Sequence, residues 1–168
     1  MNKLIAALLA LSLLGITPAS AHQPVDLLNS DTTPMAGPLL VDGTVSFAIR
    51  ATFSKAGQKK AFRAALKEGE QLDVQYLIID KKPENKLKNS RLPLLVITSP
   101  SGKKTTMKFT ERTPFYEPWG RTNYFYLGRL SEVAEDGVYS FMITARTKSA
   151  ITLGVGAREV PGEVLRDQ

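Results

Sequence analysis

The chain has no cysteine, one histidine and one tryptophan among its 168 residues. Without cysteine it can form no disulfide, no thiolate zinc site and no acylated lipoprotein N-terminus. The single histidine, His22, would have to serve any Ser-His-Asp triad from a position near the N-terminus. Apolar runs are also scarce, because nothing after the first residues approaches the roughly 20 residues of a membrane span.

The one long apolar run opens the chain and has the layout of a secretory signal peptide. Lys3 supplies a positive start, residues 4–16 are almost all apolar, and Ala19-Ser20-Ala21 is a small-x-small cleavage site. We therefore predict a signal peptide over residues 1–21 and His22 as the new N-terminus. This predicts a soluble monomer in the periplasm or outside the cell, with no membrane span after cleavage; an uncleaved signal anchor is the alternative.

Basic residues exceed acidic ones, 22 to 16, which gives a formal net charge of +6. The excess is concentrated in residues 81–91 and 103–108. Such segments attract polyanions such as surface polysaccharide or lipid headgroups, although a solvated loop face has the same composition. Nothing in the chain predicts a specific nucleic-acid partner.

The central part of the chain has the pattern of short strands. Proline, glycine and asparagine interrupt residues 22–43, which predicts an extended, partly disordered leader, and residues 160–168 read as a polar tail. Residues 59–68 fit either a helix or a strand, and we favour a strand. About eight short segments separated by turn signals predict an all-β, jelly-roll-like antiparallel β-sandwich over residues 44–159. These segments are 44–53, 59–68, 72–78, 92–98, 105–109, 124–130, 139–143 and 151–155.

Three segments carry a resemblance to known families: 66–74, 94–102 and 135–141. Their order and turn residues resemble bacterial pre-peptidase C-terminal (PPC-like) jelly-roll domains and, in the last two, the Golgi-dynamics (GOLD) sandwich. Residues 115–125 and 153–159 are also similar to a group of uncharacterised exported prokaryotic proteins. The resemblance implies a fold and supplies no catalytic residues, because these folds share no common site.

One aromatic segment is the best candidate for a binding site. Aromatic faces with polar tips suit the stacking of sugar rings, and neighbouring polar groups can bond the sugar hydroxyls. The alternative is that this loop folds over an open end of the sandwich and Trp119 covers the core. The candidate ligand-binding residues are Phe115, Tyr116, Glu117, Trp119, Arg121 and Asn123.

Other constellations are weaker. The amine and imidazole of a processed His22 could chelate copper, but only if Asp26 or Asp31 completed the site. Ser101 and Lys104 have the S-x-x-K spacing without its partner motifs. Glu132, Glu135 and Asp136 could offer oxygen ligands to calcium, although we favour a solvated turn.

We therefore expect an exported, non-catalytic binding module without a cofactor. Its expected ligand is a carbohydrate or an anionic envelope polymer. A protein-interaction or structural domain of the cell envelope is the alternative, and a copper-binding protein with an N-terminal histidine is the outsider.

Overall fold

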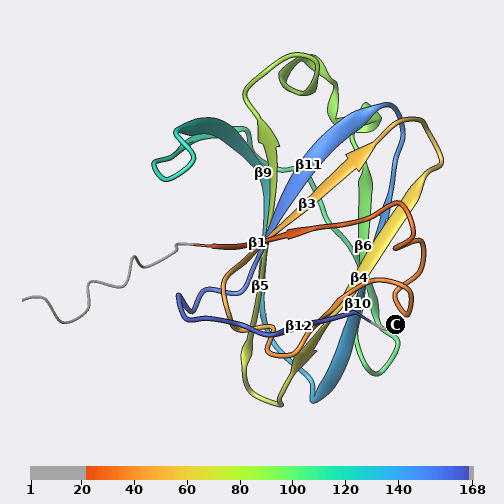
Figure 1. Ribbon diagram of the computed structural model, residues 1–168, viewed down its shortest axis with the longest axis vertical. Coiled ribbons are helices and arrows are strands. Elements are labelled where there is room, and N and C mark those ends of the chain that lie inside the picture. The colour runs from red at the N-terminus through yellow and green to blue at the C-terminus, as the bar shows by residue number, and fades with distance from the viewer. Residues whose placement is uncertain (1–21, 167–168) are drawn as a thin grey trace, which may run out of the picture.

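The computed structural model describes residues 22–166 as two packed β-sheets of six strands each. One sheet has the order β1-β3-β11-β5-β9-β8 and the other β12-β2-β4-β10-β6-β7 (Figure 1). The predicted signal peptide lies outside the described residues. The strands are β1 (Gln23–Asp26), β2 (Leu39–Leu40), β3 (Phe47–Phe53), β4 (Lys59–Leu66), β5 (Gln71–Ile79), β6 (Leu94–Thr98), β7 (Lys104–Thr106), β8 (Thr113–Glu117), β9 (Thr122–Val133), β10 (Gly137–Thr144), β11 (Ser149–Val155) and β12 (Val164–Leu165).

The predicted all-β sandwich is confirmed, and its central strands have jelly-roll connectivity. Strands β3, β11, β5 and β9 form the middle of one sheet, and β4, β10, β6 and β7 face them in the other. Neighbours within each of these quartets pair antiparallel, as in a jelly roll. Within the described residues, no helix is long and apolar enough to cross a membrane.

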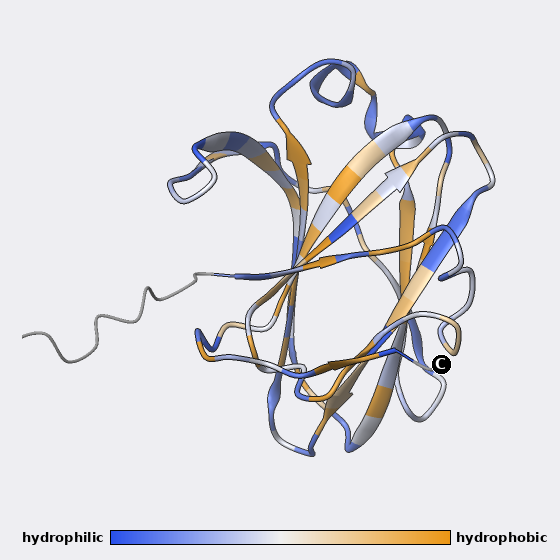
Figure 2. Ribbon diagram, in the orientation of Figure 1, coloured by the Kyte–Doolittle hydropathy of each residue, from blue (hydrophilic) through white to orange (hydrophobic). Residues whose placement is uncertain are grey.

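Side chains alternate along the strands, so one face of each sheet is buried between the two layers. Figure 2 shows the apolar positions recurring along the strands of both sheets. Phe62 of β4 and Phe141 of β10 stack with ring centroids 4.3 Å apart. Tyr76 of β5 packs against Phe109 and donates a 2.7 Å hydrogen bond to the carbonyl of Pro93. Burying this hydroxyl is tolerated because it has a partner.

The ambiguous segment 59–68 is strand β4, in which Lys59–Leu66 pairs with β10 along its whole length. Its alanines favour a helix only weakly, and tertiary pairing overrides such a preference. Phe62, Ala64 and Leu66 face the core, as alternation requires.

We predicted an extended leader over residues 22–43 and a polar tail over residues 160–168. Both predictions are wrong in one respect, because each segment contributes strands to the sheets. β1 pairs parallel with β3, and β2 pairs parallel with β4, so the sheets are mixed rather than wholly antiparallel. β12, within the predicted tail, pairs with β2. These strands have four, two and two residues, which is too short to produce a periodic signal in the sequence.

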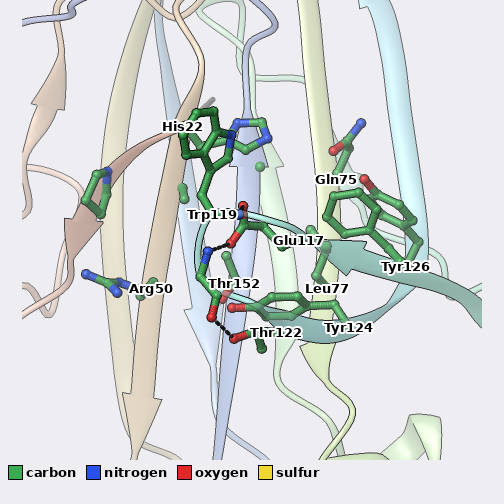
Figure 3. A pocket seen from close by; sticks show the side chains of 15 residues that line it. His22, Arg50, Gln75, Leu77, Glu117, Trp119, Thr122, Tyr124, Tyr126 and Thr152 are labelled. Atoms are coloured by element: carbon green, nitrogen blue, oxygen red, sulfur yellow. Dashed lines mark hydrogen bonds between the residues drawn. The ribbon is translucent and has the colours of Figure 1, made fainter. Parts of the chain in front are cut away.

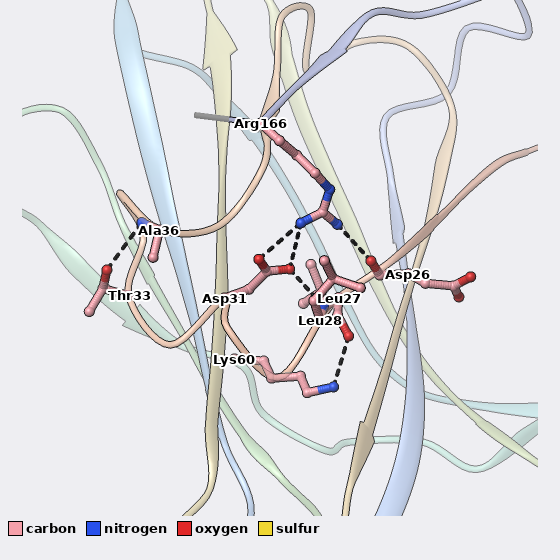
Figure 4. A network of polar contacts seen from close by, with 8 residues as sticks. All are labelled: Asp26, Leu27, Leu28, Asp31, Thr33, Ala36, Lys60 and Arg166. Atoms are coloured by element: carbon pink, nitrogen blue, oxygen red, sulfur yellow. Dashed lines mark hydrogen bonds and ion pairs between the residues drawn. The ribbon is translucent and has the colours of Figure 1, made fainter. Parts of the chain in front are cut away.

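A polar network fastens the two ends of the described chain to each other (Figure 4). The Arg166 guanidinium donates to both carboxylate oxygens of Asp31 at 2.9 Å and to the carbonyl of Asp26 at 2.7 Å. The Asp31 carboxylate is 1% exposed and also accepts the Leu28 N–H. Nearby, the buried Lys60 ammonium donates to the carbonyl of Leu27, and burial lowers its pKa. The contact of Arg166 Nη1 with both oxygens of Asp31 compensates for the removal of that carboxylate from water.

We expect Arg166→Ala to lower the free energy of unfolding by about 2 kcal/mol, because it leaves the Asp31 carboxylate buried without its cation. Urea titration followed by circular dichroism measures the change. Arg158→Ala is the control, since its ion pair with Asp42 has side chains 59% and 42% exposed and should contribute less than about 1 kcal/mol. Equal losses in the two variants would contradict the role of burial.

Candidate functional site

A pocket of about 660 Å³ opens on the outer face of the sheet that contains β3, β11, β5 and β9. We call it the outer pocket. Its walls come from β1, β3, β5, β11 and the hairpin of β8 and β9, as Figure 3 shows. The lining residues are His22, Pro24, Ala48, Arg50, Gln75, Leu77, Phe115, Glu117, Trp119, Gly120, Thr122, Tyr124, Tyr126, Thr152 and Gly154.

The predicted aromatic loop is in fact a β-hairpin. β8 and β9 pair antiparallel from Thr113↔Tyr126 to Glu117↔Thr122, and residues 118–121 form the turn. Figure 1 shows this hairpin bending away from the sandwich. Aromatic residues favour strands, so the same residues that suggested a loop instead build a projecting wall.

A β-bulge in β9 accounts for the bend. Leu77 pairs with Tyr126 and Tyr76 pairs with Gly128, which leaves Leu127 as the extra residue. Leu127 is buried in the core, while Tyr126 lines the outer pocket. A bulge bends its strand and increases the local twist, and therefore turns the hairpin out of the plane of the sheet.

Small residues hollow the floor of the outer pocket. Gly154 of β11 pairs with Ala48 of β3 on one side and with Gln75 of β5 on the other. A Cβ atom at Gly154 would lie 3.1 Å from the Gln75 side-chain oxygen. A larger side chain at Gly154 would therefore occupy the space that a ligand needs.

Glu117 holds the hairpin turn together. Its carboxylate accepts the backbone N–H of Trp119 at 2.8 Å and the backbone N–H of Gly120. Gly120 permits this approach, because a Cβ there would lie 2.7 Å from the Glu117 oxygen. The Thr122 hydroxyl closes the turn by donating to the Gly120 carbonyl at 2.9 Å. Glu117 thus positions Trp119 rather than standing free.

The aromatic side chains of the outer pocket differ in exposure. Trp119 is 64% exposed, so it does not cover the core, and the alternative interpretation of this segment is wrong. Phe115 and Tyr126 lie with ring centroids 5.0 Å apart, and the Arg129 guanidinium lies 3.9 Å from the Tyr126 centroid. This contact fixes the Tyr126 ring from its other side.

The structure divides the predicted site residues by strand alternation. Phe115, Glu117 and Trp119 line the outer pocket. Tyr116 and Asn123 form the pair between Phe115↔Tyr124 and Glu117↔Thr122. Because side chains alternate along a strand, these two lie on the opposite face of the hairpin. Arg121 lies in the turn with a backbone φ of 50°, which is unusual for a residue other than glycine. It does not line the pocket.

The sequence prediction missed the part of the pocket contributed by the sheet. The missed polar residues are Arg50, Gln75, Thr122, Tyr124, Tyr126 and Thr152. All of them except Thr122 occupy outward positions of strands that were expected, so the alternation could have placed these on the outer face. Nothing in the sequence shows that β3, β11, β5 and β9 are neighbours.

Each carboxylate considered as a copper ligand is paired with an arginine. His22 lines the outer pocket and its Nδ1 hydrogen-bonds the Ser46 hydroxyl. Asp26 pairs with Arg50 at 2.8 Å and Asp31 pairs with Arg166. Residues 22–166 contain no group of three or more histidine or carboxylate side chains placed to hold a metal ion.

The S-x-x-K motif lies at a turn, as expected. The Ser101 hydroxyl donates to Glu135 at 2.8 Å, and the Ser101 N–H donates to the same carboxylate at 2.9 Å. These bonds lower the Glu135 pKa, and they tie the turn after β6 to the turn before β10. Ser101 and Glu135 thus have a structural explanation, which covers one of the three residues considered for calcium.

The phenol of Tyr124 is sensitive to the charge of Glu117. Burial raises the pKa of Tyr124, the Glu117 carboxylate raises it further, and Arg50 opposes them. Burial also raises the pKa of Tyr126, but there the nearby charges are Arg129 and Glu111. The two phenols therefore share the outer pocket and respond to different carboxylates.

We expect Glu117→Gln to lower the Tyr124 pKa, because removing a negative charge makes the phenolate less costly to form. Titration of ¹³Cζ-labelled tyrosine by NMR measures each phenol separately. The Tyr126 pKa is the internal control and should change little. A fall of both values together would show a general opening of the hairpin instead.

No protein-family profile and no curated protein matches the chain. Several solved structures match the chain weakly, and two of them are as follows. The periplasmic inhibitor of g-type lysozyme PliG from Salmonella Typhimurium is 10% identical, with a TM-score of 0.37 over 79% of this chain and 97% of that one. CorA, a surface-associated copper-binding protein of Methylomicrobium album, is 13% identical, with a TM-score of 0.31 over 77% of this chain and all of the other.

Proposed function

We propose that the protein is an exported carbohydrate-binding module whose ligand occupies the outer pocket. The observation that carries this proposal is the exposed indole of Trp119, held by Glu117 at the rim of a pocket on the sheet face. Trp119 shares this pocket with the rings of Phe115, Tyr124 and Tyr126, and a cluster of aromatic rings at the surface marks a binding site more specifically than a single exposed side chain does. The signal peptide predicted over residues 1–21 supports export.

The pocket chemistry suits a sugar ring. Its volume of about 660 Å³ lies within the roughly 300–1,000 Å³ of small-molecule sites. Trp119 and Phe115 offer apolar faces, while Gln75 and Thr152 offer amide and hydroxyl groups. Sugar rings present apolar C–H faces and equatorial hydroxyls, which this mixture of side chains complements.

We propose binding rather than catalysis, since a glycoside hydrolase uses a pair of carboxylates. Among the lining residues, which all fall within 22–166, Glu117 is the only carboxylate. Both of its oxygens accept backbone N–H groups of the turn. This arrangement favours a positioning role for Glu117.

We expect Trp119→Ala to weaken glycan binding at least tenfold, because it removes the stacking surface. A glycan array identifies the ligand, and fluorescence of the single tryptophan measures its affinity in the unmodified protein. Isothermal calorimetry measures the affinity of the variant. Tyr116→Ala is the matched control: this side chain is 53% exposed in the same hairpin and points to the opposite face. Equal losses in both variants would exclude the outer pocket as the site.

We expect Gly154→Val to abolish binding by filling the pocket floor while leaving the fold intact. The nearest neighbours of a Cβ at this position are atoms of the flexible Gln75 side chain, and valine suits a strand. A thermal melt checks the fold, and the same calorimetric titration checks binding. Full affinity in a folded Gly154→Val protein would place the ligand elsewhere.

The protein-interaction hypothesis makes a different prediction for the same variants. Tryptophan and arginine are the residues most often found at the energetic centre of protein interfaces. A protein partner that Trp119→Ala releases, together with a glycan array without signal, would replace the carbohydrate proposal with an envelope-protein one.

A further inference from the structure

We infer that one end of the sandwich, formed by the connections β3–β4, β5–β6 and β10–β11, attaches the protein to an anionic membrane surface. We call it the cationic end. It is distinct from the outer pocket, which opens on the face of a sheet. The basic side chains in these connections and at the first residue of β4 are all exposed: Lys55, Lys59, Lys81, Lys82, Lys86, Lys88, Arg91, Arg146 and Lys148.

Hydrogen bonds show that these distant segments meet. The Gly57 N–H donates to the Ala145 carbonyl at 2.8 Å, and the Ala145 N–H returns a bond to Gln58 at 2.9 Å. Arg146 donates to the Ser90 carbonyl at 3.4 Å, and Arg112 donates to the Asn85 carbonyl at 2.9 Å. Residues separated by many positions in the sequence therefore share one surface.

A buried carboxylate holds the long β5–β6 connection in place. Glu84, in the 3₁₀ turn Glu84–Lys86, is 9% exposed and accepts the Ala150 N–H at 3.1 Å. Asp80 accepts a 2.9 Å bond from Asn85. The two acidic groups of this end are thus engaged in shaping the connection, while the lysines point into solvent.

The charge of the chain is strongly polarised. The cationic end has nine basic and two acidic side chains, a net +7, whereas the whole chain has a formal net charge of +6. The remainder is therefore net negative. None of the nine basic side chains forms an ion pair with another residue of the described part of the chain. A charge left uncompensated in this way produces a directed field.

The composition of the cationic end favours a membrane over a chain-like ligand. None of the large exposed hydrophobic side chains of residues 22–166 lies in its three connections. Stacking of sugars or bases therefore has no platform there. The charges extend over three connections that link both sheets, so a surface of headgroups can engage more of them than a single strand can. Every basic residue near an anionic leaflet adds to this attraction, so the contributions of several exposed lysines accumulate.

Vesicle co-sedimentation of the processed protein tests this inference. We expect binding to phosphatidylcholine vesicles in which about one lipid in three is phosphatidylglycerol, and none to phosphatidylcholine alone. Binding should be lost between about 0.1 M and 1 M salt, as the screening length falls from about 10 Å to 3 Å. Absence of binding to the anionic vesicles at low salt would overturn the inference.

A matched pair of charge reversals separates the cationic end from net charge. Lys81→Glu/Lys82→Glu/Lys86→Glu should weaken vesicle binding at least tenfold. The control is Lys67→Glu/Lys103→Glu/Lys104→Glu, which changes the net charge equally at exposed positions of the opposite end. Equal losses of vesicle binding in both triple variants, with unchanged thermal melts, would show that only the net charge matters. That result would overturn the assignment of the cationic end as the membrane-binding site.

Two further measurements complete the test. Trp119→Ala should keep its vesicle binding, which makes this result independent of the carbohydrate proposal; a loss would assign the membrane contact to the hairpin instead. Binding to dextran sulfate without binding to the anionic vesicles would identify a polyanionic chain as the ligand, contrary to the inference.

Discussion

The extra residue in β9 is the constraint on which the outer pocket depends. Leu127 has no partner in β5 and its side chain is buried in the core. The part of β9 that precedes it can therefore turn away from the sheet. Gly128 fits beside it because a Cβ there would lie 2.3 Å from the Lys108 carbonyl. Without the bulge, β8 and β9 would continue the sheet instead of walling a pocket.

The ends of the described chain complete both the fold and the site. β1 adds an edge to the sheet that bears the outer pocket, and β1 and the preceding residue place His22 and Pro24 in its wall. The Gln23 side chain exchanges two hydrogen bonds with the backbone of Gly162, at 2.9 and 3.0 Å. The pocket therefore depends on the N-terminal segment of the described chain, which Gly162 near the other end holds in place.

Two kinds of recognition surface lie on different parts of the same sandwich. The outer pocket combines aromatic rings with amide and hydroxyl groups, and its Arg50 is already paired with Asp26. The cationic end has charge without exposed aromatic side chains. Short-range contacts dominate in the first and long-range, salt-sensitive attraction in the second, so a ligand and an attachment surface need not compete.

The sequence by itself determined the all-β class, the positions of the long strands and the aromatic segment, because side-chain alternation is a local property. It also identified Phe115, Glu117 and Trp119, which line the outer pocket. It could not separate them from Tyr116 and Asn123, because it does not show which side chains of the hairpin face the pocket. Only the tertiary structure decided which strands are neighbours. That choice joined Arg50, Gln75 and Thr152 to the hairpin, recruited the short terminal strands and gathered the lysines at one end. Pairing between distant segments depends on packing energy summed over the whole core, which no local pattern contains.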